Sequence, residues 1–358
     1  MQVLSRLGLA LLIFIGADAA IFRSGFYGRY LEPDSSAGMM QLTLLRERKH
    51  QAEWQEPLVL TMGDSRMNYS PKLANEYAAQ KGYKFRLTHG GVAGTNPRVW
   101  HYMLRELDPT ARRYTAIVFP VDDYDDEDTY IDYTDYPLDV NYLSLLLRYT
   151  DLPEYPRSYT TPQYALEAWK ACLVKGASLQ PDLLAFFNSP KQRLETAHVT
   201  RDWWPNGSYD YLESEKNVAG LSIDWTTRAV TYPPGVNEAF KQAVATVMLR
   251  PNAPQTGRYG KYRRRWFEQI FRRYEGSPTR FIFVKLPRGP ILRPPVQTLS
   301  HSIRDFASRP GVLLGDEHRA EPLERPEFFH DVLHMNRAGS TQYGKLLVDD
   351  LARWLGAL

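Results

Sequence analysis

The feature that most constrains the fold is a regular alternation of strand-like and helix-like segments within residues 57–126. Three runs have the length and character of buried strands: Leu58–Met62, Lys84–Thr88 and Thr115–Val121. Helical patterns fill the intervals between them, at Pro71–Lys81 and Asn96–Leu107. Strands joined through helices pair in parallel and are covered by helices on both faces. We therefore expect a three-layer α/β/α parallel sheet of the flavodoxin-like type.

The alternation stops near residue 126 and resumes much later in the chain. Two more strands and a closing helix are predicted at Arg280–Pro287, Val312–Leu314 and Ser340–Leu355. The intervening region is rich in Tyr, Trp, Pro and Asp, with helical patterns at Asn141–Arg148, Tyr164–Val174 and Asn237–Met248. The predicted organisation is an α/β domain of residues 57–126 and 278–358, with a mainly helical cap inserted at residues 127–277.

Residues 1–22 have the character of an export segment. The apolar stretch Leu7–Gly16 follows Arg6, and Ala17-Asp18-Ala19 has the small-x-small pattern of a cleavage site. Extended through Phe22, the segment approaches the roughly 20 residues that a spanning helix needs. We expect a single-pass N-terminal membrane anchor with the rest of the chain outside the cytoplasm, in the periplasm. A cleaved signal and a buried N-terminal helix are the alternatives, and residues 23–56 form a connector.

Composition excludes several classes of function. The chain has 358 residues, 43% of them hydrophobic, which is enough for a substantial core. Its net charge of +3, from 44 basic and 41 acidic residues, gives no general argument for binding nucleic acid. The single cysteine, Cys172, excludes an internal disulfide and a cysteine-based zinc site. We predict no metal and no cofactor.

Two short motifs at opposite ends of the α/β pattern carry the chemistry. Gly63-Asp64-Ser65 directly follows the first predicted strand, and Asp331-x-x-His334 precedes the closing helix. A serine at a strand end with an Asp/His pair is the minimum set for a Ser-His-Asp nucleophile. Each motif has a plainer alternative. Asp64 or Ser65 can be the N-cap of a strand-to-helix turn, and His334 can be an ordinary loop histidine.

With this fold pattern, the motifs resemble those of the SGNH, or GDSL, hydrolase superfamily over residues 57–126 and 278–356. Four superfamily motifs have counterparts here: Gly63-Asp64-Ser65, Gly91-Val92-Ala93-Gly94, Pro120-Val121-Asp122-Asp123, and Asp331-x-x-His334 followed by Asn336 and Gly339. The second motif lacks the family's leading Asn, because His89 and Gly90 stand there.

The resemblance implies a role for each matching residue. Ser65 would attack a carbonyl carbon, His334 would accept and later return the proton, and Asp331 would orient the imidazole. The backbone N–H groups of Ser65 and Gly94 would form the oxyanion hole. Arg66 and Asn96 are candidate substrate-binding residues.

Asp122 departs from the family pattern, which has an Asn at this position as a third oxyanion donor. An ionised carboxylate cannot donate a hydrogen bond, and one missing donor costs about 2.7–4 kcal/mol of barrier. Three explanations are open: Asp122 is protonated in a dry site, it does not face the oxyanion hole, or the protein has lost hydrolytic power.

Other patterns have two interpretations each. The acidic run of residues 122–128 is either a cation site or a solvated face, and it lacks the spacing of a calcium loop. The basic and aromatic segment Arg258–Arg273 either binds an anionic glycan or lipid headgroups, or is an amphipathic helix with a cationic outer face. Aromatic residues of the cap either stack on carbohydrate or pack in a core: Trp203, Trp204, Tyr209, Tyr211, Trp225 and Tyr232.

The organisation is similar to that of exported alginate-type O-acetyltransferases. This implies acyl transfer or ester hydrolysis, with acetyl as the expected group, on a cell-envelope polysaccharide through an acyl-serine intermediate. The expected partners are a cell-envelope glycan or an acylated small molecule, the membrane, and a membrane-bound acyltransferase. One alternative is an inactive SGNH-fold scaffold that binds glycan or such an acyltransferase. The other is an esterase of small esters or lipids.

Overall fold

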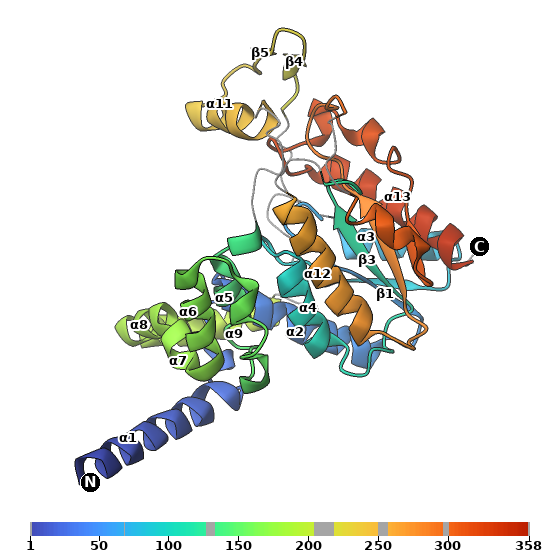
Figure 1. Ribbon diagram of the computed structural model, residues 1–358. Helices are drawn as coiled ribbons and strands as arrows, with labels where there is room; N and C mark the ends of the chain where they lie inside the picture. The colour runs from blue at the N-terminus through green and yellow to red at the C-terminus, as the bar shows by residue number, and fades with distance from the viewer. Residues whose placement is uncertain are drawn as a thin grey trace. The chain divides into compact units, whose positions relative to one another are not determined.

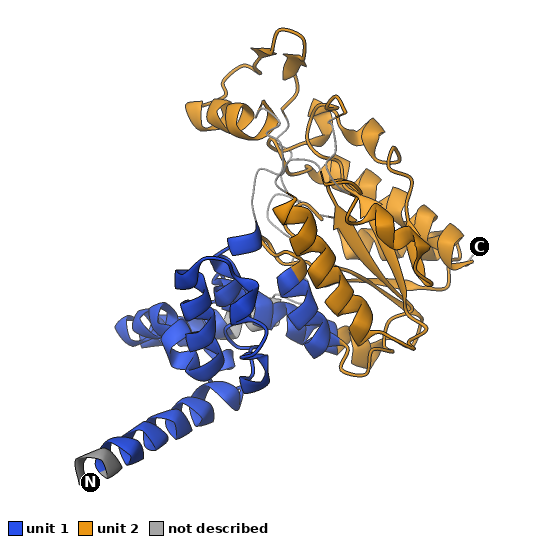
Figure 2. Ribbon diagram, viewed as in Figure 1, with its two compact units in different colours: residues 1–48, 98–107, 133–207 blue, residues 49–97, 108–132, 208–358 orange. Residues whose placement is uncertain are grey.

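The computed structural model describes residues 2–67, 69–126, 133–203, 218–249, 257–295 and 301–356. The chain divides into two compact units, which are coloured separately in Figure 2. Unit 1 comprises residues 1–48, 98–107 and 133–207, and unit 2 comprises residues 49–97, 108–132 and 208–358. The predicted cap, residues 127–277, is therefore shared between the units, because residues 208–277 belong with the sheet.

Unit 2 is built on a five-stranded parallel sheet with the order β2-β1-β3-β6-β7. Its strands are β1 (Leu58–Thr61), β2 (Arg86–His89), β3 (Ala116–Val121), β6 (Arg280–Lys285) and β7 (Val312–Leu314). Counted within the sheet alone this is the order 2-1-3-4-5, as in flavodoxin-like doubly wound folds. The predicted parallel α/β sheet is confirmed. Its direction of winding reverses between β1 and β3, where ligands of such folds bind.

Helices cover both faces of this sheet, because successive residues of a strand point to opposite sides. On one face Phe119 and Phe283 meet Phe267 of α12 (Arg258–Arg273), with ring centroids 5.1 and 5.0 Å apart. On the other face Val118 and Ile282 belong to a core cluster shared with α3 (Pro71–Gln80) and α13 (Arg337–Leu355). Figure 1 shows α12 on the side of the sheet opposite α3 and α13.

The remaining elements of unit 2 are short. They are the antiparallel pair β4 (Ser222–Asp224) and β5 (Ala229–Thr231), then α11 (Glu238–Ala243), η7 (Val244–Met248), η8 (Arg304–Ser308), η9 (Glu321–Leu323) and η10 (Pro326–Phe328). The helix expected at Asn237–Met248 is α11 continued by the π-helical turn η7.

Unit 1 is helical over its described residues. Its elements are α1 (Gln2–Asp18), η1 (Ala19–Arg23), η2 (Tyr27–Arg29), α2 (Ser36–Glu53, ending in unit 2), α4 (Pro97–Leu107, beginning in unit 2), η3 (Tyr133–Asp135), α5 (Leu138–Leu143), η4 (Tyr149–Asp151), η5 (Pro156–Ser158), α6 (Pro162–Leu173), α7 (Lys175–Ser178), α8 (Gln180–Asn188) and α9 (Pro190–Trp203). The helix expected at Asn141–Arg148 instead covers Leu138–Leu143, because Pro137 sets its start.

The end of the N-terminal apolar segment is part of the folded unit 1. Asp18 is buried, and its carboxylate accepts the backbone N–H groups of Lys175 at 3.1 Å and Gly176 at 2.7 Å. The guanidinium of Arg23 donates to the carbonyl of Cys172 at 2.5 Å. Phe22 belongs to a small core that also contains Tyr27, Leu31, Ala37 and Leu179.

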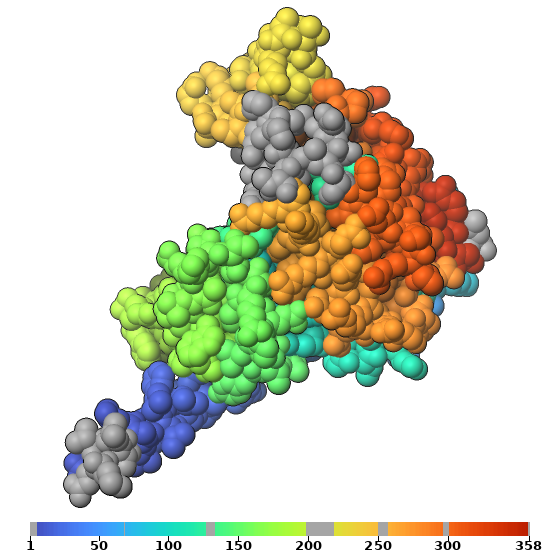
Figure 3. All heavy atoms as spheres, viewed as in Figure 1, coloured from blue at the N-terminus to red at the C-terminus, as the bar shows by residue number. Residues whose placement is uncertain are grey.

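The predicted membrane anchor is wrong. That expectation required the apolar stretch to continue through Phe22 as one helix. Asp18 and Phe22 are instead buried in unit 1, and α1 has only 17 residues. Among the described helices, none combines the length and the apolar character required to cross a membrane. The apolar side chains between Leu7 and Phe14 are exposed, and the α1 segment is shown at the blue end of Figure 3. The extracytoplasmic location drawn from an anchor has no support.

Candidate active site

The turn that carries Ser65 depends on a glycine. Gly63 has φ +152°, and a Cβ at this position would lie 2.6 Å from Cβ of Met67 and 2.8 Å from Cγ of Pro120. Only glycine fits such a position, and it lets the chain turn sharply as it leaves β1. Asp64 closes the turn by accepting the backbone N–H of Arg66 at 2.8 Å.

The plainer interpretation of Gly63-Asp64-Ser65 as a helix cap does not hold. The next helix, α3, begins at Pro71, and its N-cap is Ser70, whose hydroxyl accepts the N–H of Leu73 at 3.3 Å. Asp64 and Ser65 therefore belong to a separate turn at the carboxyl edge of the sheet.

Three side chains that are distant in sequence form a continuous hydrogen-bonded chain. Ser65 Oγ lies 3.0 Å from Nε2 of His334. Nδ1 of the same imidazole lies 2.8 Å from Oδ2 of Asp331. This is the geometry of an activated serine, with a base on the hydroxyl and a carboxylate on the far side of the base. The structure therefore brings together Ser65, His334 and Asp331 as the motifs predicted.

Asp331 is held ionised by its surroundings. Its second oxygen, Oδ1, accepts the backbone N–H groups of Leu333 at 2.8 Å and His334 at 2.7 Å. Burial alone would raise the pKa of this carboxyl, but hydrogen bonds and charge from His334, with the two backbone donors, lower the pKa below its ordinary value. A charged Asp331 fixes the imidazole with Nδ1–H toward it and leaves Nε2 to accept the serine proton.

Asn336 and Gly339 shape the loop that carries His334. The Asn336 side chain caps α13 by accepting the N–H of Gly339 at 3.0 Å, and it donates to the carbonyl of Glu327 at 2.7 Å. A Cβ on Gly339 would collide with the carbonyl oxygen of Phe328. Because this cap begins the helix at Arg337, α13 starts three residues before the predicted Ser340.

The loop after β2 is tied to the nucleophile turn. The carbonyl of Gly63 accepts the N–H of Val92 at 3.1 Å and the hydroxyl of Thr95 at 3.0 Å. Gly94 lies within this loop with φ +71°. The loop is therefore in the right neighbourhood for an oxyanion hole, and the assignment of the Ser65 and Gly94 N–H groups stays a prediction.

A buried polar network behind the turn escaped the sequence analysis. Thr61 Oγ1 lies 2.9 Å from the hydroxyl of Tyr69 and 3.0 Å from Nδ1 of His89. His89 stands where the family has its leading Asn, and a Cβ on Gly91 would collide with the His89 ring. A strand-end histidine followed by two glycines was the available signal in the sequence.

No family model matches this chain, and no curated protein matches it. The SGNH resemblance therefore rests on the motifs and on the geometry that joins them.

Asn96, a candidate for substrate binding, makes a hydrogen bond within the protein. It is buried, and its side-chain oxygen accepts the hydroxyl of Tyr262 from α12 at 2.6 Å. This bond fixes the loop after β2 to the helix layer, and a contact of Asn96 with substrate stays a prediction.

Asp122 and Arg66 form an ion pair that the motifs did not reveal. One guanidinium nitrogen of Arg66, Nη1, bonds Oδ1 of Asp122, and another, Nη2, bonds Oδ2 of Asp64 at 2.7 Å. Asp122 thus has a cationic partner that compensates its charge. None of the three explanations drawn from the sequence included such a partner. The signal available in the sequence for this ion pair was Arg66 directly after Ser65, together with Asp122 in the third motif.

The other described carboxylates of the acidic run also have protein partners. Asp123 pairs with Arg263, Asp125 with Arg304 and His301, and Asp126 with Ser302. Over the described residues no group of three or more His, Cys, Asp or Glu side chains could hold a metal ion. The cation site is therefore not supported for residues 122–126, and residues 127 and 128 lie outside the described part.

The segment Arg258–Arg273 is an amphipathic helix whose aromatic side packs on the sheet. Trp266 and Phe267 are fully buried, and Phe271 stacks edge-on against Phe281. Of the cap aromatics, Trp225 donates to the carbonyl of Leu292 at 3.1 Å and Tyr232 packs against the core. The remainder of that group lies outside the described side chains: Trp203, Trp204, Tyr209 and Tyr211.

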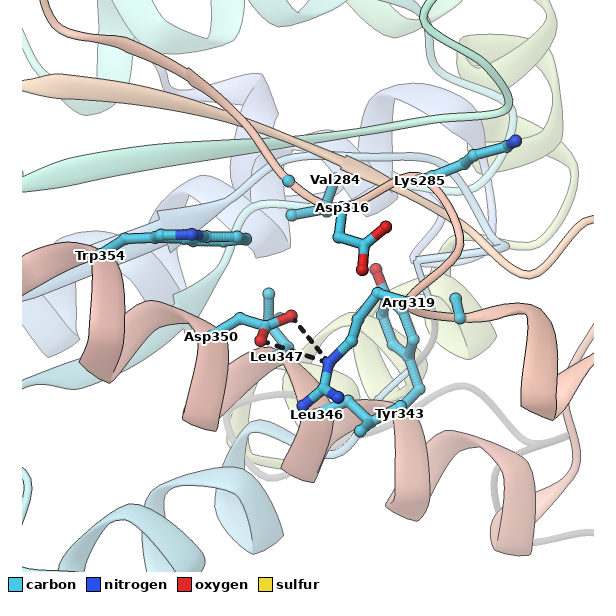
Figure 4. A pocket seen from close by; sticks show the side chains of 11 residues that line it. Val284, Lys285, Asp316, Arg319, Tyr343, Leu346, Leu347, Asp350 and Trp354 are labelled. Atoms are coloured by element: carbon cyan, nitrogen blue, oxygen red, sulfur yellow. Dashed lines mark hydrogen bonds and ion pairs between the residues drawn. The ribbon is translucent and has the colours of Figure 1, made fainter.

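A small cavity lies beside the carboxyl ends of β6 and β7 (Figure 4). Trp354 and Asp316 line it, and the buried Tyr343 hydroxyl, which has no hydrogen-bond partner, points toward Asp316. Its open volume of about 20 Å³ suits one ordered water, which would satisfy that hydroxyl. The catalytic candidates are not part of its lining, and we assign it no role in the chemistry.

Proposed function

We propose that this protein is an SGNH-type serine acyltransferase or esterase that works through an acyl-serine intermediate. The observation that carries the proposal is the hydrogen-bonded chain from Ser65 through His334 to Asp331. Its place supports the proposal as well, because Ser65 follows β1 at the point where the winding of the sheet reverses.

The first half of the reaction follows from these contacts. Ser65 Oγ attacks the carbonyl carbon of an ester while His334 Nε2 accepts the hydroxyl proton. The charge that develops on the carbonyl oxygen is met by backbone N–H groups of the turn and of the Gly94 loop. The tetrahedral intermediate then collapses, the imidazolium gives its proton to the leaving alkoxide, and the acyl group remains on Ser65.

The second half determines the class of enzyme. Water or an acceptor hydroxyl attacks the acyl-serine while His334 accepts its proton, and Ser65 leaves with that proton returned. With water the reaction is ester hydrolysis. With a sugar hydroxyl it is acyl transfer. In either case we expect the acyl group to be acetyl and the molecule that gains or loses it to be a polysaccharide.

One observation favours the inactive scaffold as a second candidate. Asp122 stands at the motif position where the SGNH pattern has an uncharged donor, and an ionised carboxylate cannot donate a hydrogen bond to the oxyanion. A scaffold would keep its phenotype when Ser65 or His334 is replaced by Ala.

Acyl-enzyme trapping tests the proposal. The full chain is mixed with an activated aryl acetate, quenched in acid, and its intact mass is measured beside Ser65→Ala. We expect one acetyl group on the wild type and none on the variant. Faster loss of the acetyl group on addition of an oligosaccharide indicates a transferase, and loss at an unchanged rate indicates a hydrolase. A folded wild type that gains no acetyl group and releases no aryl alcohol would reject both enzymatic forms.

A further inference from the structure

Arg66 joins two loops at the carboxyl edge of the sheet. Its guanidinium contacts Asp64, within the nucleophile turn, and Asp122, in the loop after β3. The side chain of Arg66 is 14% exposed, and those of Asp64 and Asp122 are 10% and 24% exposed. Pairs shielded to this degree are screened less than surface pairs and hold their geometry better.

Asp64 and Arg66 bracket the nucleophile. Asp64 accepts the backbone N–H of Arg66 at 2.8 Å and the side-chain Nη2 at 2.7 Å. Ser65 lies between these two residues in the chain, so their contacts close the turn that presents its hydroxyl.

The loop after β3, which carries Asp122, is itself held in place by buried contacts. Next to Asp122, Asp123 pairs with the buried Arg263 of α12 at 3.5 Å. Asp126 accepts the hydroxyl of Ser302 at 2.5 Å, and both side chains are buried. The loop after β3 is thus a firm point to which Arg66 attaches the nucleophile turn.

Without Arg66, the negative charges near Ser65 would lack a positive partner. Asp64 and Asp331 lie in the loops that carry Ser65 and His334, and Asp122 lies in the loop after β3. Replacing the cation would leave two of them without this counter-charge beside a serine whose reaction generates an oxyanion.

We propose that Arg66 is a positioning residue, which ties the nucleophile turn to the loop after β3 and compensates the charge of Asp122. Asp122 thereby occupies the place of an uncharged donor without disabling the site. This inference rests on the proposed function, because it concerns the reactivity of Ser65.

The test compares rates of labelling of Ser65 by a fluorophosphonate in four proteins: the wild type, Arg66→Met, Asp122→Asn and the double variant. Arg66→Met should react roughly 10–100-fold more slowly, as expected for coupled neighbouring charges. The double variant should recover part of that loss, because one of the two carboxylates that Arg66 compensates is gone. Independent roles would instead make the double variant slower than either single variant, which would overturn the inference.

Saturation kinetics separate positioning from substrate binding. The maximal rate of labelling should fall in Arg66→Met while the half-saturating probe concentration stays the same. A rise in that concentration at an unchanged maximal rate would mean that Arg66 binds substrate and would overturn the positioning role. Arg86→Met, which breaks an exposed pair with Glu56, is the matched control and should label at the wild-type rate.

Two further comparisons keep the test decisive. Circular dichroism shows whether Arg66→Met folds. If it does not, Arg66→Lys is measured instead, alone and combined with Asp122→Asn. The single variant is again expected to react more slowly than the double variant. Wild-type protein that is folded but unreactive rejects the proposed function itself. Reactive wild-type protein with an equally reactive Arg66→Met rejects this inference alone.

Discussion

At the scale of single residues, the proposed reactivity of Ser65 depends on atoms held in place by backbone geometry. The sequence predicted the three catalytic candidates because their motifs are local: Gly63-Asp64-Ser65 is one turn, and Asp331 and His334 are three residues apart. The pairing of Arg66 with Asp122 could not be predicted in the same way. It joins loops 56 residues apart along the chain, and their relative position depends on the register of β1 with β3.

Gly63→Ala tests the steric requirement at the nucleophile turn. The new methyl group would collide with Met67 and Pro120 in addition to the penalty for positive φ. We expect slower fluorophosphonate labelling and a loss of more than about 2 kcal/mol in the free energy of unfolding, measured in urea. Gly82→Ala is the matched control, because Gly82 also has positive φ but open space around it. It should lose only about 1–2 kcal/mol and keep its reactivity.

Asp331→Asn tests the role of the carboxylate in orienting His334. The amide oxygen can still accept the backbone N–H groups of Leu333 and His334, so the loop is expected to keep its shape. The amide cannot stabilise the imidazolium, and it favours the wrong tautomer, so turnover of an aryl acetate should fall by about 10⁴-fold. Asp305→Asn, which removes an exposed partner of Arg264, should leave turnover unchanged. Equal rates for Asp331→Asn and wild type would exclude the triad.

At the scale of elements, the five strands of the parallel sheet were predicted within two residues at every boundary. The hairpin β4–β5 was missed because each strand has three largely exposed residues and therefore no hydrophobic period. The N-terminal segment was mistaken for an anchor because hydropathy along the chain cannot show that Asp18 caps α7. That contact spans 157 residues of sequence.

We expect Lys175 of α7 to make the stability of unit 1 depend on pH. Burial, with the nearby charge of Arg23, lowers its pKa to about 7, and its Nζ donates to the carbonyl of Ser144 at 2.6 Å. Between pH 7 and the ordinary lysine value of about 10.4, the unfolded chain holds a proton that the folded chain has released. Stability should therefore rise with pH across this window, by up to about 1.4 kcal/mol per pH unit.

Urea unfolding at pH 7 and pH 9.5 measures this dependence. Lys175→Met should remove most of the rise. Lys170→Met, which breaks an exposed pair with Glu167 in the same unit, should retain it. An equal rise in all three proteins would show that Lys175 is charged in the folded state.

At the scale of the whole molecule, the chain offers one chemical reporter in each compact unit. Cys172 lies in unit 1, and burial raises the pKa of its thiol to about 12. Since only the thiolate reacts readily, the native protein should not react with Ellman's reagent, and reactivity should develop only as unit 1 unfolds in urea. Ser65 lies in unit 2 and should react with a fluorophosphonate in the native state. Rapid thiol modification without denaturant would contradict the burial of Cys172.

The proposed function depends most on Ser65 being an activated nucleophile. The most direct measurement is the intact mass, followed by peptide mapping, of the full chain treated with a fluorophosphonate beside Ser65→Ala and His334→Ala. We predict a single adduct on Ser65 in the wild type, none in Ser65→Ala, and strongly slowed labelling in His334→Ala. A folded wild type without an adduct, or an adduct that persists in Ser65→Ala, would contradict the nucleophilic role of Ser65.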